Sequence, residues 1–88
     1  MRIEYFVCNT KIKDGLINYY ILEKELNTES GFYEYGIKLE LITFDCTYCK
    51  TVEYFCDNYD KIKNIIYTLR RNKVTPLGLY DVLIENFV

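Results

Sequence analysis

Four cysteines are the side chains of this 88-residue chain whose type and spacing could do chemistry. Two residues separate Cys46 from Cys49, and at this spacing two thiolates can bind one metal ion or join in a disulfide. Cys8 and Cys56 could complete a four-sulfur zinc site, but neither has a second cysteine nearby, whereas a zinc ribbon uses two close pairs. We therefore expect ordinary buried or turn cysteines, with a cysteine-dependent zinc-binding or redox module as the alternative.

The residues that most often carry out catalysis are scarce. The chain contains no histidine, so the usual general base near neutral pH is missing. Its one serine, Ser30, falls in a stretch with loop composition, and no glycine-rich loop that would hold a phosphate is present. We therefore predict that the protein is not an enzyme and uses no cofactor.

Tyrosines could instead stack on the bases of a single-stranded nucleic acid, as they do in sheet-based RNA binders. Tyr33 and Tyr35 are two residues apart and would share one face of a strand, but that face is also the one expected to point into the core. Acidic residues outnumber basic ones by 13 to 11, so the chain lacks the positive charge that a nucleic-acid backbone attracts. Nucleic-acid binding through a Tyr-rich sheet is kept as a second alternative.

The carboxylates of Asp81 and Glu85 are four residues apart and would lie on one side of a helix. Such a pair could perform acid–base chemistry or bind a divalent ion, but it would also form the polar stripe of an otherwise apolar helix. We expect the second role, with this stripe at the edge of a partner-binding surface. That surface is predicted to contain Tyr80, Asp81, Ile84, Glu85 and Val88.

Alternating polarity predicts four strands, at residues 2–8, 16–24, 32–44 and 51–55. The dipeptide Asp14-Gly15 is typical of a type I′ hairpin turn, in which both central residues have positive φ. Gly36 interrupts the longest run and indicates a bulge or a close backbone approach. Residues 27–31 have the composition of a loop, and residues 45–49 are expected to form a tight connection.

The same alternation assigns the side chains of the outer strands to opposite sides of the sheet. Ile3, Tyr5 and Val7 would share one side of the first strand, with Cys8 on the other side. In the fourth strand, Val52 and Tyr54 are expected to point inward.

Two helices are predicted to follow the strands. Asp57 would cap the first helix, whose apolar residues recur at helical spacing, and Asn72 would end it in a left-handed conformation. Thr75 and Pro76 suit the N-cap and the first position of the second helix.

The second helix carries two apolar stripes. One is formed by Leu79, Leu83 and Phe87, broadened by Val82, and is expected to pack on the sheet. The other is formed by Tyr80, Ile84 and Val88, and is expected to pack against the preceding helix or against a second copy of the protein, because small monomers seldom expose so much contiguous apolar area.

Length and composition favour one domain, residues 1–88, with a sheet part at 1–56 and a helical hairpin at 57–88. Half of the residues are hydrophobic, which is too many for a disordered chain. We find neither a signal peptide nor a membrane-spanning segment, so the expected location is the cytoplasm, where the cysteines would be reduced.

Three segments resemble a small family of proteins from anaerobic, spore-forming Gram-positive bacteria. They are Tyr35-Gly36-Ile37 in the long strand, residues 74–82, and Glu85-Asn86-Phe87. The resemblance covers most of the chain and is most specific over the last fifteen or so residues, although Asn86 replaces the acidic residue expected before Phe87. The family has no assigned activity, and its pattern does not include the cysteines.

Together these features predict an α+β fold in which a four-stranded, mainly antiparallel meander is followed by two C-terminal helices packed on one face. The predicted function is a small cytoplasmic protein-interaction or regulatory module, linked to sporulation or stress. Its expected partner is a protein, including a second copy in a homodimer, and neither a nucleic acid nor a membrane.

Overall fold

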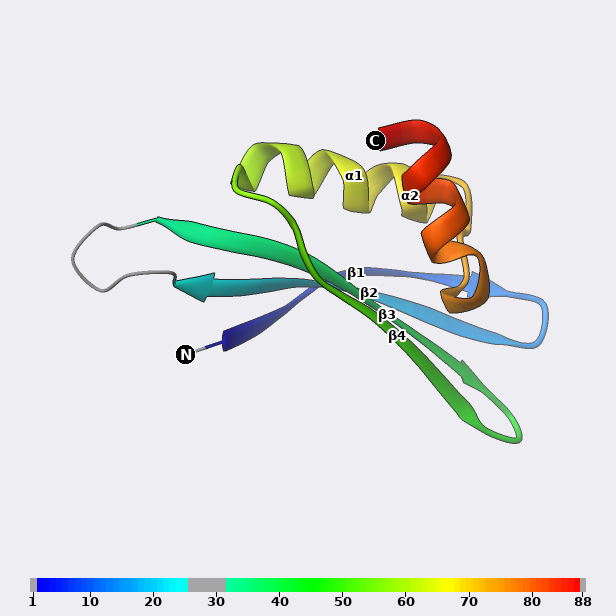
Figure 1. Cartoon of the computed structure of the whole chain (residues 1–88). Helices are drawn as coiled ribbons and strands as arrows, with labels where there is room; N and C mark the ends of the chain where they lie inside the picture. Colours follow the sequence, from blue (N-terminus) through cyan, green and yellow to red (C-terminus); the bar gives the residue numbers. More distant parts are fainter. Residues whose placement is uncertain (1, 26–31, 88) are drawn as a thin grey trace.

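The computed structural model describes residues 2–25 and 32–87, which form an α+β architecture (Figure 1). Four strands make an antiparallel sheet in the order β1-β2-β3-β4, and the helices lie together on one of its faces. The elements are β1 (Arg2–Ile12), β2 (Gly15–Glu25), β3 (Tyr33–Thr43), β4 (Thr47–Cys56), α1 (Tyr59–Arg71), η1 (Pro76–Gly78) and α2 (Leu79–Phe87). The predicted fold class is confirmed, whereas the loop predicted at 27–31 lies outside the described residues.

The core fills the space between the sheet and the helices. Alternate residues of the central strands supply one side: Ile17, Tyr19 and Ile21 of β2, and Ile37 and Leu39 of β3. The helices supply the other side: Ile62, Ile65, Ile66 and Leu69 of α1, and Leu79 and Leu83 of α2. Removing these apolar side chains from water is the main force that holds the two layers together.

β1 differs from its prediction because it contains a bulge. The strand continues to Ile12 instead of ending at Cys8, and its register with β2 shifts between Phe6 and Cys8. The extra residue reverses the alternation, so Cys8 packs against the core together with Val7, although the two were predicted to lie on opposite sides of the strand. The prediction was wrong because a strict period of two cannot show where an extra residue enters a strand.

β4 is also longer than predicted. It begins at Thr47, so most of the connection expected at residues 45–49 is strand instead, and only a short turn separates it from β3. The backbone N–H of Thr43 donates to the carbonyl of Cys46 at 2.8 Å and closes that turn. Cys49 is therefore a strand residue and not a turn residue.

Gly36 marks a second register shift, between β3 and β4, as its position in the long strand predicted. A Cβ atom at this position would collide with the carbonyl oxygens of Val52 and Glu53, so only glycine allows β4 to approach so closely. Val52 packs against the core as expected, but the irregularity leaves Tyr54 exposed, contrary to its prediction.

The hairpin between β1 and β2 forms where it was predicted but with a different turn. Ile12 pairs with Gly15, so Lys13 and Asp14 are the turn residues, and neither has the positive φ that a type I′ turn requires. Gly15 is needed for another reason, because a Cβ there would collide with the carbonyl oxygen of Ile42 in β3.

The N-cap and the left-handed residue of α1 each lie one residue beyond the position predicted for them, while Asn72 is the C-cap. Asn58, and not Asp57, is the N-cap: its Oδ1 accepts the backbone N–H of Lys61 at 2.9 Å. At the other end, Lys73 has a φ of 52°, whereas Asn72 has a φ of −92°. Both predictions chose a suitable residue type at the wrong position, because the neighbouring residue could perform the same role.

A Schellman motif ends α1. The N–H of Val74 donates to the carbonyl of Leu69 at 3.0 Å, and the N–H of Lys73 donates to that of Arg70 at 3.0 Å. The Tyr19 hydroxyl from β2 donates to the Val74 carbonyl at 3.1 Å. This buried hydrogen bond joins the end of α1 to the centre of the sheet.

α2 is preceded by one 3₁₀ turn. Thr75 is the N-cap and Pro76 the first residue of that turn, as predicted, although the Thr75 side chain makes no capping bond. Leu79 and Leu83 are buried and Phe87 is half-buried, which confirms the stripe expected to face the sheet. Within residues 2–25 and 32–87, no helix is long and apolar enough to cross a membrane.

A helix side chain bonds to the backbone of each edge strand. In an antiparallel pair, every second residue points its backbone N–H and C=O away from the partner strand. Counting from the hairpin turns shows that Asn9 of β1 and Thr51 of β4 are residues of this kind. The Nε of Arg70 donates to the Asn9 carbonyl at 2.9 Å, and the hydroxyl of Tyr80 donates to the Thr51 carbonyl at 3.4 Å. These bonds protect part of each edge from pairing with another strand.

Candidate functional site

A groove with a volume of about 450 Å³ lies between the β3–β4 hairpin and the 3₁₀ turn η1. Leu41, Tyr48 and Lys50 form the strand side, and Pro76 and Leu77 form the other side. The lining is mainly apolar, and Lys50 is its charged member. A groove of this size and composition falls within the range of sites that bind ligands or side chains of partner proteins.

Two local features hold the groove in shape. The ring of Tyr80 lies under the ammonium group of Lys50, 4.4 Å from its centroid, and its hydroxyl bonds to β4, so α2 is fixed against this strand. In η1, the N–H of Gly78 donates to the carbonyl of Thr75 at 3.1 Å, which presents Leu77 outward. Both sides of the groove are therefore anchored to hydrogen-bonded elements.

Five large apolar side chains on the β3–β4 hairpin, η1 and the adjoining α2 are exposed, and we refer to them as the groove surface. Their exposed fractions are 100 % for Phe44, 91 % for Leu77, 63 % for Ile84, 57 % for Tyr48 and 45 % for Tyr80. Figure 1 shows the β3–β4 hairpin and α2 on the near side of the molecule, where these residues lie. Small monomers rarely expose so much contiguous apolar area without using it.

The residues predicted to bind a partner lie partly on this surface. Tyr80, Asp81, Ile84 and Glu85 are exposed on α2, and Val88 lies outside the described residues. The structure does not bury Tyr80 and Ile84 under α1, so the expected packing against the preceding helix was wrong for these two residues, and packing against a second copy stays a prediction.

Sequence reasoning missed the other half of the groove surface. Phe44 was assigned to the end of a strand, Tyr48 to the tight connection at 45–49 and Leu77 to the start of the second helix, and none was given a role. Tyr48 could have been noticed as a large aromatic residue inside a predicted turn, where polar residues are usual. The proximity of Phe44 and Tyr48 to α2 could not have been predicted, because it depends on how the helices lie on the sheet.

The structure does not bring the four cysteines together. Strand alternation places Cys49 on the face away from the helices, opposite Glu40, whereas Cys46 lies beside Thr43 at a distance of 3.6 Å from its hydroxyl. Cys8 belongs to the other edge strand, and Cys56 is buried at the far end of β4. In the described part of the chain, no three Cys, Asp or Glu side chains are grouped closely enough to hold a metal ion.

Cys46 and Cys8 differ in their acidity. The hydroxyls of Tyr48 and Thr43 bond to the sulfur of Cys46 and hold its pKa below the ordinary thiol value. Burial raises the pKa of Cys8, which disfavours its thiolate. The exposed thiol of Cys46 therefore ionises more readily than the half-buried thiol of Cys8.

Tyr33 and Tyr35 share a face of β3, as predicted, but that face lies under the start of α1. Tyr35 is buried, and its ring meets that of Tyr59 at a centroid distance of 5.7 Å and an angle of 65°. Tyr33 stacks on Tyr35 at 6.3 Å. The ring of Tyr35 is therefore occupied by protein contacts and is not an open platform for a base.

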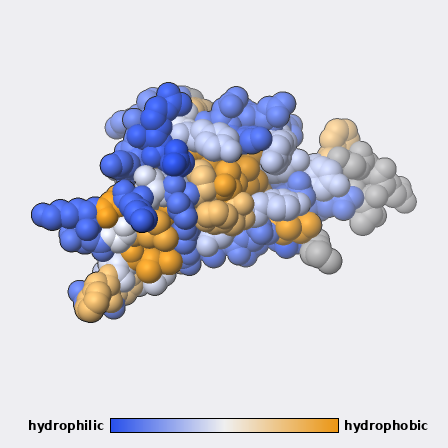
Figure 2. All heavy atoms as spheres, turned by 180° about the vertical axis from the view of Figure 1, so that it is seen from behind, coloured by the Kyte–Doolittle hydropathy of each residue, from blue (hydrophilic) through white to orange (hydrophobic). Residues whose placement is uncertain are grey.

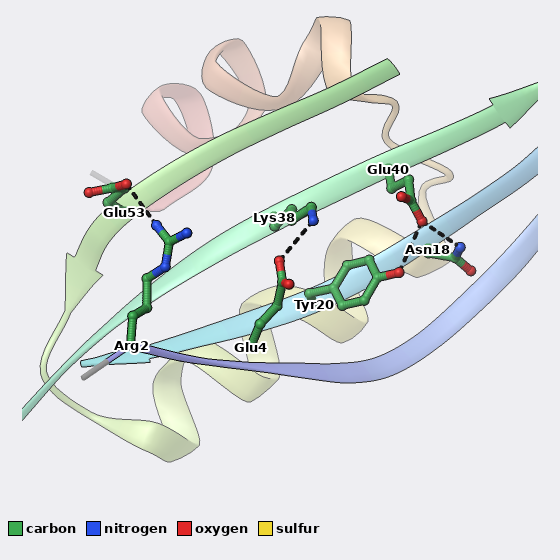
Figure 3. A network of polar contacts seen from close by, with 7 residues as sticks. All are labelled: Arg2, Glu4, Asn18, Tyr20, Lys38, Glu40 and Glu53. Atoms are coloured by element: carbon green, nitrogen blue, oxygen red, sulfur yellow. Dashed lines mark hydrogen bonds and ion pairs between the residues drawn. The ribbon is translucent and has the colours of Figure 1, made fainter. Parts of the chain in front are cut away.

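Polar side chains cover the sheet face that carries no helix (Figure 3). Seven of them form cross-strand contacts: Arg2 with Glu53 at 2.7 Å, Lys38 with Glu4 at 2.8 Å, and Asn18 and Tyr20 with Glu40 at 3.0 and 2.9 Å. Hydrogen bonds from Asn18 and Tyr20 lower the pKa of Glu40. Because these charges are paired with one another, this face is suited to contact with water more than to binding a partner.

The comparisons with known proteins give a family and no activity. A model of a family of unknown function, DUF6514, matches residues 2–88. The chain belongs to this family. No curated protein and no solved structure matches it.

Membership in DUF6514 agrees with the expected resemblance to a small family without an assigned activity. It also means that the role of this DUF6514 chain has to be inferred from its surfaces. Of these, the groove surface combines highly exposed apolar side chains with a groove between two elements.

Proposed function

We propose that this DUF6514 protein is a small interaction module that acts by binding and not by catalysis, and that the groove surface is where it binds. The observation that carries the proposal is the exposure of Phe44, Leu77 and Ile84 on the elements that line or adjoin one apolar groove. Removing exposed apolar side chains from water lowers the free energy, so association through such a surface is favourable. A cytoplasmic regulatory role, in sporulation or stress, extends this proposal on the basis of the family resemblance.

A second copy of the chain is the partner that fits this surface best. In a two-fold dimer the same surface patch of each copy forms the interface, so a protruding side chain must fit a groove on that same patch of the other copy. Leu77 protrudes at the margin of the groove, and the apolar groove beside it could receive the Leu77 of another copy. Across the same axis, Lys50 of one copy would approach the exposed carboxylates of Asp81 and Glu85 in the other.

The area available is sufficient for such a dimer. A fully exposed aromatic or leucine side chain contributes on the order of 150–200 Å², so the five residues of the groove surface and their polar neighbours approach the roughly 800 Å² per partner of an ordinary specific interface.

Sedimentation of the purified protein over the micromolar to submillimolar range tests the proposal. We expect a monomer–dimer equilibrium in the wild type and a shift toward monomer in Leu77→Glu and in Ile84→Glu, with unchanged thermal unfolding of the monomer. Phe6→Glu is the matched control, because Phe6 is an exposed apolar residue on the opposite face of the sheet. A wild type that stays monomeric, or a dimer that Phe6→Glu weakens as much as Leu77→Glu does, would refute the second-copy interface.

A further inference from the structure

A second hollow, with a volume of about 520 Å³, lies at the other edge of the sheet, between β1 and α1. We refer to it as the tyrosine hollow; Tyr5, Ile21 and Glu23 form its sheet wall, and Tyr59, Lys63 and Tyr67 form its helix wall. Figure 2 looks at the molecule from this side, and apolar atoms are visible between the helix layer and the sheet. The order β1-β2-β3-β4 separates this hollow from the groove surface by the full width of the sheet.

Three aromatic rings give the tyrosine hollow its character. Tyr5, Tyr59 and Tyr67 are between 41 % and 46 % exposed, so each ring is held by the protein on one side and open on the other. The edge contact between Tyr35 and Tyr59 fixes one of these rings in place. The faces of such rings attract organic cations, and several rings around one space form the usual site for alkylated ammonium groups.

The two walls carry opposite charges. On the sheet wall, Glu23 accepts a hydrogen bond from the Tyr5 hydroxyl at 2.9 Å, which fixes the position of the carboxylate without removing its charge. The presence of this carboxylate raises the pKa of Tyr5. On the helix wall, Lys63 forms no ion pair or hydrogen bond with any side chain of residues 2–25 or 32–87.

We infer that the tyrosine hollow binds a small zwitterion, in which an alkylated ammonium group lies among the tyrosine rings near Glu23 and a carboxylate pairs with Lys63. The charges complement both walls, and neither a simple cation nor a simple anion would satisfy both. The hollow is large enough for such a molecule, since ligand sites of this kind begin at about 300 Å³. The inference does not depend on the groove surface.

Three probes of nearly the same shape separate the contributions of the two charges. Trimethylglycine carries both charges, choline carries the cation alone, and tert-butylacetate carries the anion alone. Titration calorimetry or tyrosine signals in NMR spectra should show that trimethylglycine binds about tenfold more tightly than either of the others. No binding by any probe, or equal binding by all three, would overturn the inference.

Substitutions assign each charge to its wall. Glu23→Gln should weaken the binding of trimethylglycine and of choline about tenfold and leave the binding of tert-butylacetate unchanged. Lys63→Gln should weaken the binding of trimethylglycine and of tert-butylacetate and leave the binding of choline unchanged. Glu34→Gln and Lys61→Gln are matched controls outside the hollow. Thermal unfolding by circular dichroism verifies that each variant is folded, and a folded Glu23→Gln or Lys63→Gln protein that binds trimethylglycine like wild type would also overturn the inference.

Discussion

Removing the hydroxyl of Tyr19 tests how the end of α1 is attached to the sheet. This buried hydroxyl donates to the Val74 carbonyl at 3.1 Å and lies 3.5 Å from that of Leu69. Tyr19→Phe removes this donor from the Val74 carbonyl, while the Leu69 carbonyl keeps the N–H of Val74, and we expect the free energy of unfolding to fall by about 1–2 kcal/mol. Urea unfolding followed by circular dichroism at neutral pH measures this loss. Tyr67→Phe is the control and should unfold like wild type, because the Tyr67 ring is exposed.

The same hydroxyl predicts a difference between the two proteins at high pH. Burial raises the pKa of Tyr19 from 10.0 to about 12. A group whose pKa is higher in the folded state contributes stability that is fully present below pH 10 and is lost as the pH rises toward 12, here about 2–3 kcal/mol. Wild type should therefore lose stability more steeply than Tyr19→Phe across this range. Parallel pH profiles, or equal stability at neutral pH, would refute the reasoning.

Three further substitutions test local features of the fold. Asn58→Ala removes the N-cap of α1 and should lower the free energy of unfolding by about 1 kcal/mol in urea titrations. Lys73→Gly should raise the free energy of unfolding by about 0.5–1 kcal/mol, because the φ of Lys73 is 52°. Asn72→Gly should lower it by a similar amount, because the φ of Asn72 is −92°. A change of the same sign in both variants would contradict this account. Arg70→Met frees the outward carbonyl of β1 and should increase light scattering over time, while Arg71→Met, with no such bond, should not.

The sequence was most informative where a pattern was long and one side of it was buried. The thirteen-residue alternation at 32–44 predicted β3 and its core face, because shifting such a strand by one residue would expose every apolar side chain. The buried side of α1 was predicted by the helical spacing of Tyr59, Ile62, Ile65, Ile66 and Leu69, of which Tyr59 alone is exposed.

Details that depend on a single residue could not be predicted. Asp57 and Asn58 are both good N-caps, and the choice between them depends on where β4 ends, which in turn depends on the irregularity opposite Gly36. Lys73 gives no sign that it adopts a left-handed conformation, because its side chain takes no part in the motif that requires it.

The position of the groove surface follows from a difference in length between the two layers. A strand of 11 residues spans about 36 Å, whereas α1 with 13 residues spans about 20 Å and α2 with 9 residues about 14 Å. Neither helix can cover the face on which it packs, and Figure 1 shows hairpins that extend past the helix layer. The first and last strands were predicted too short, which hid this difference. Apolar side chains on the uncovered hairpin end need another molecule to remove them from water, and this is the physical reason to expect binding at the groove surface.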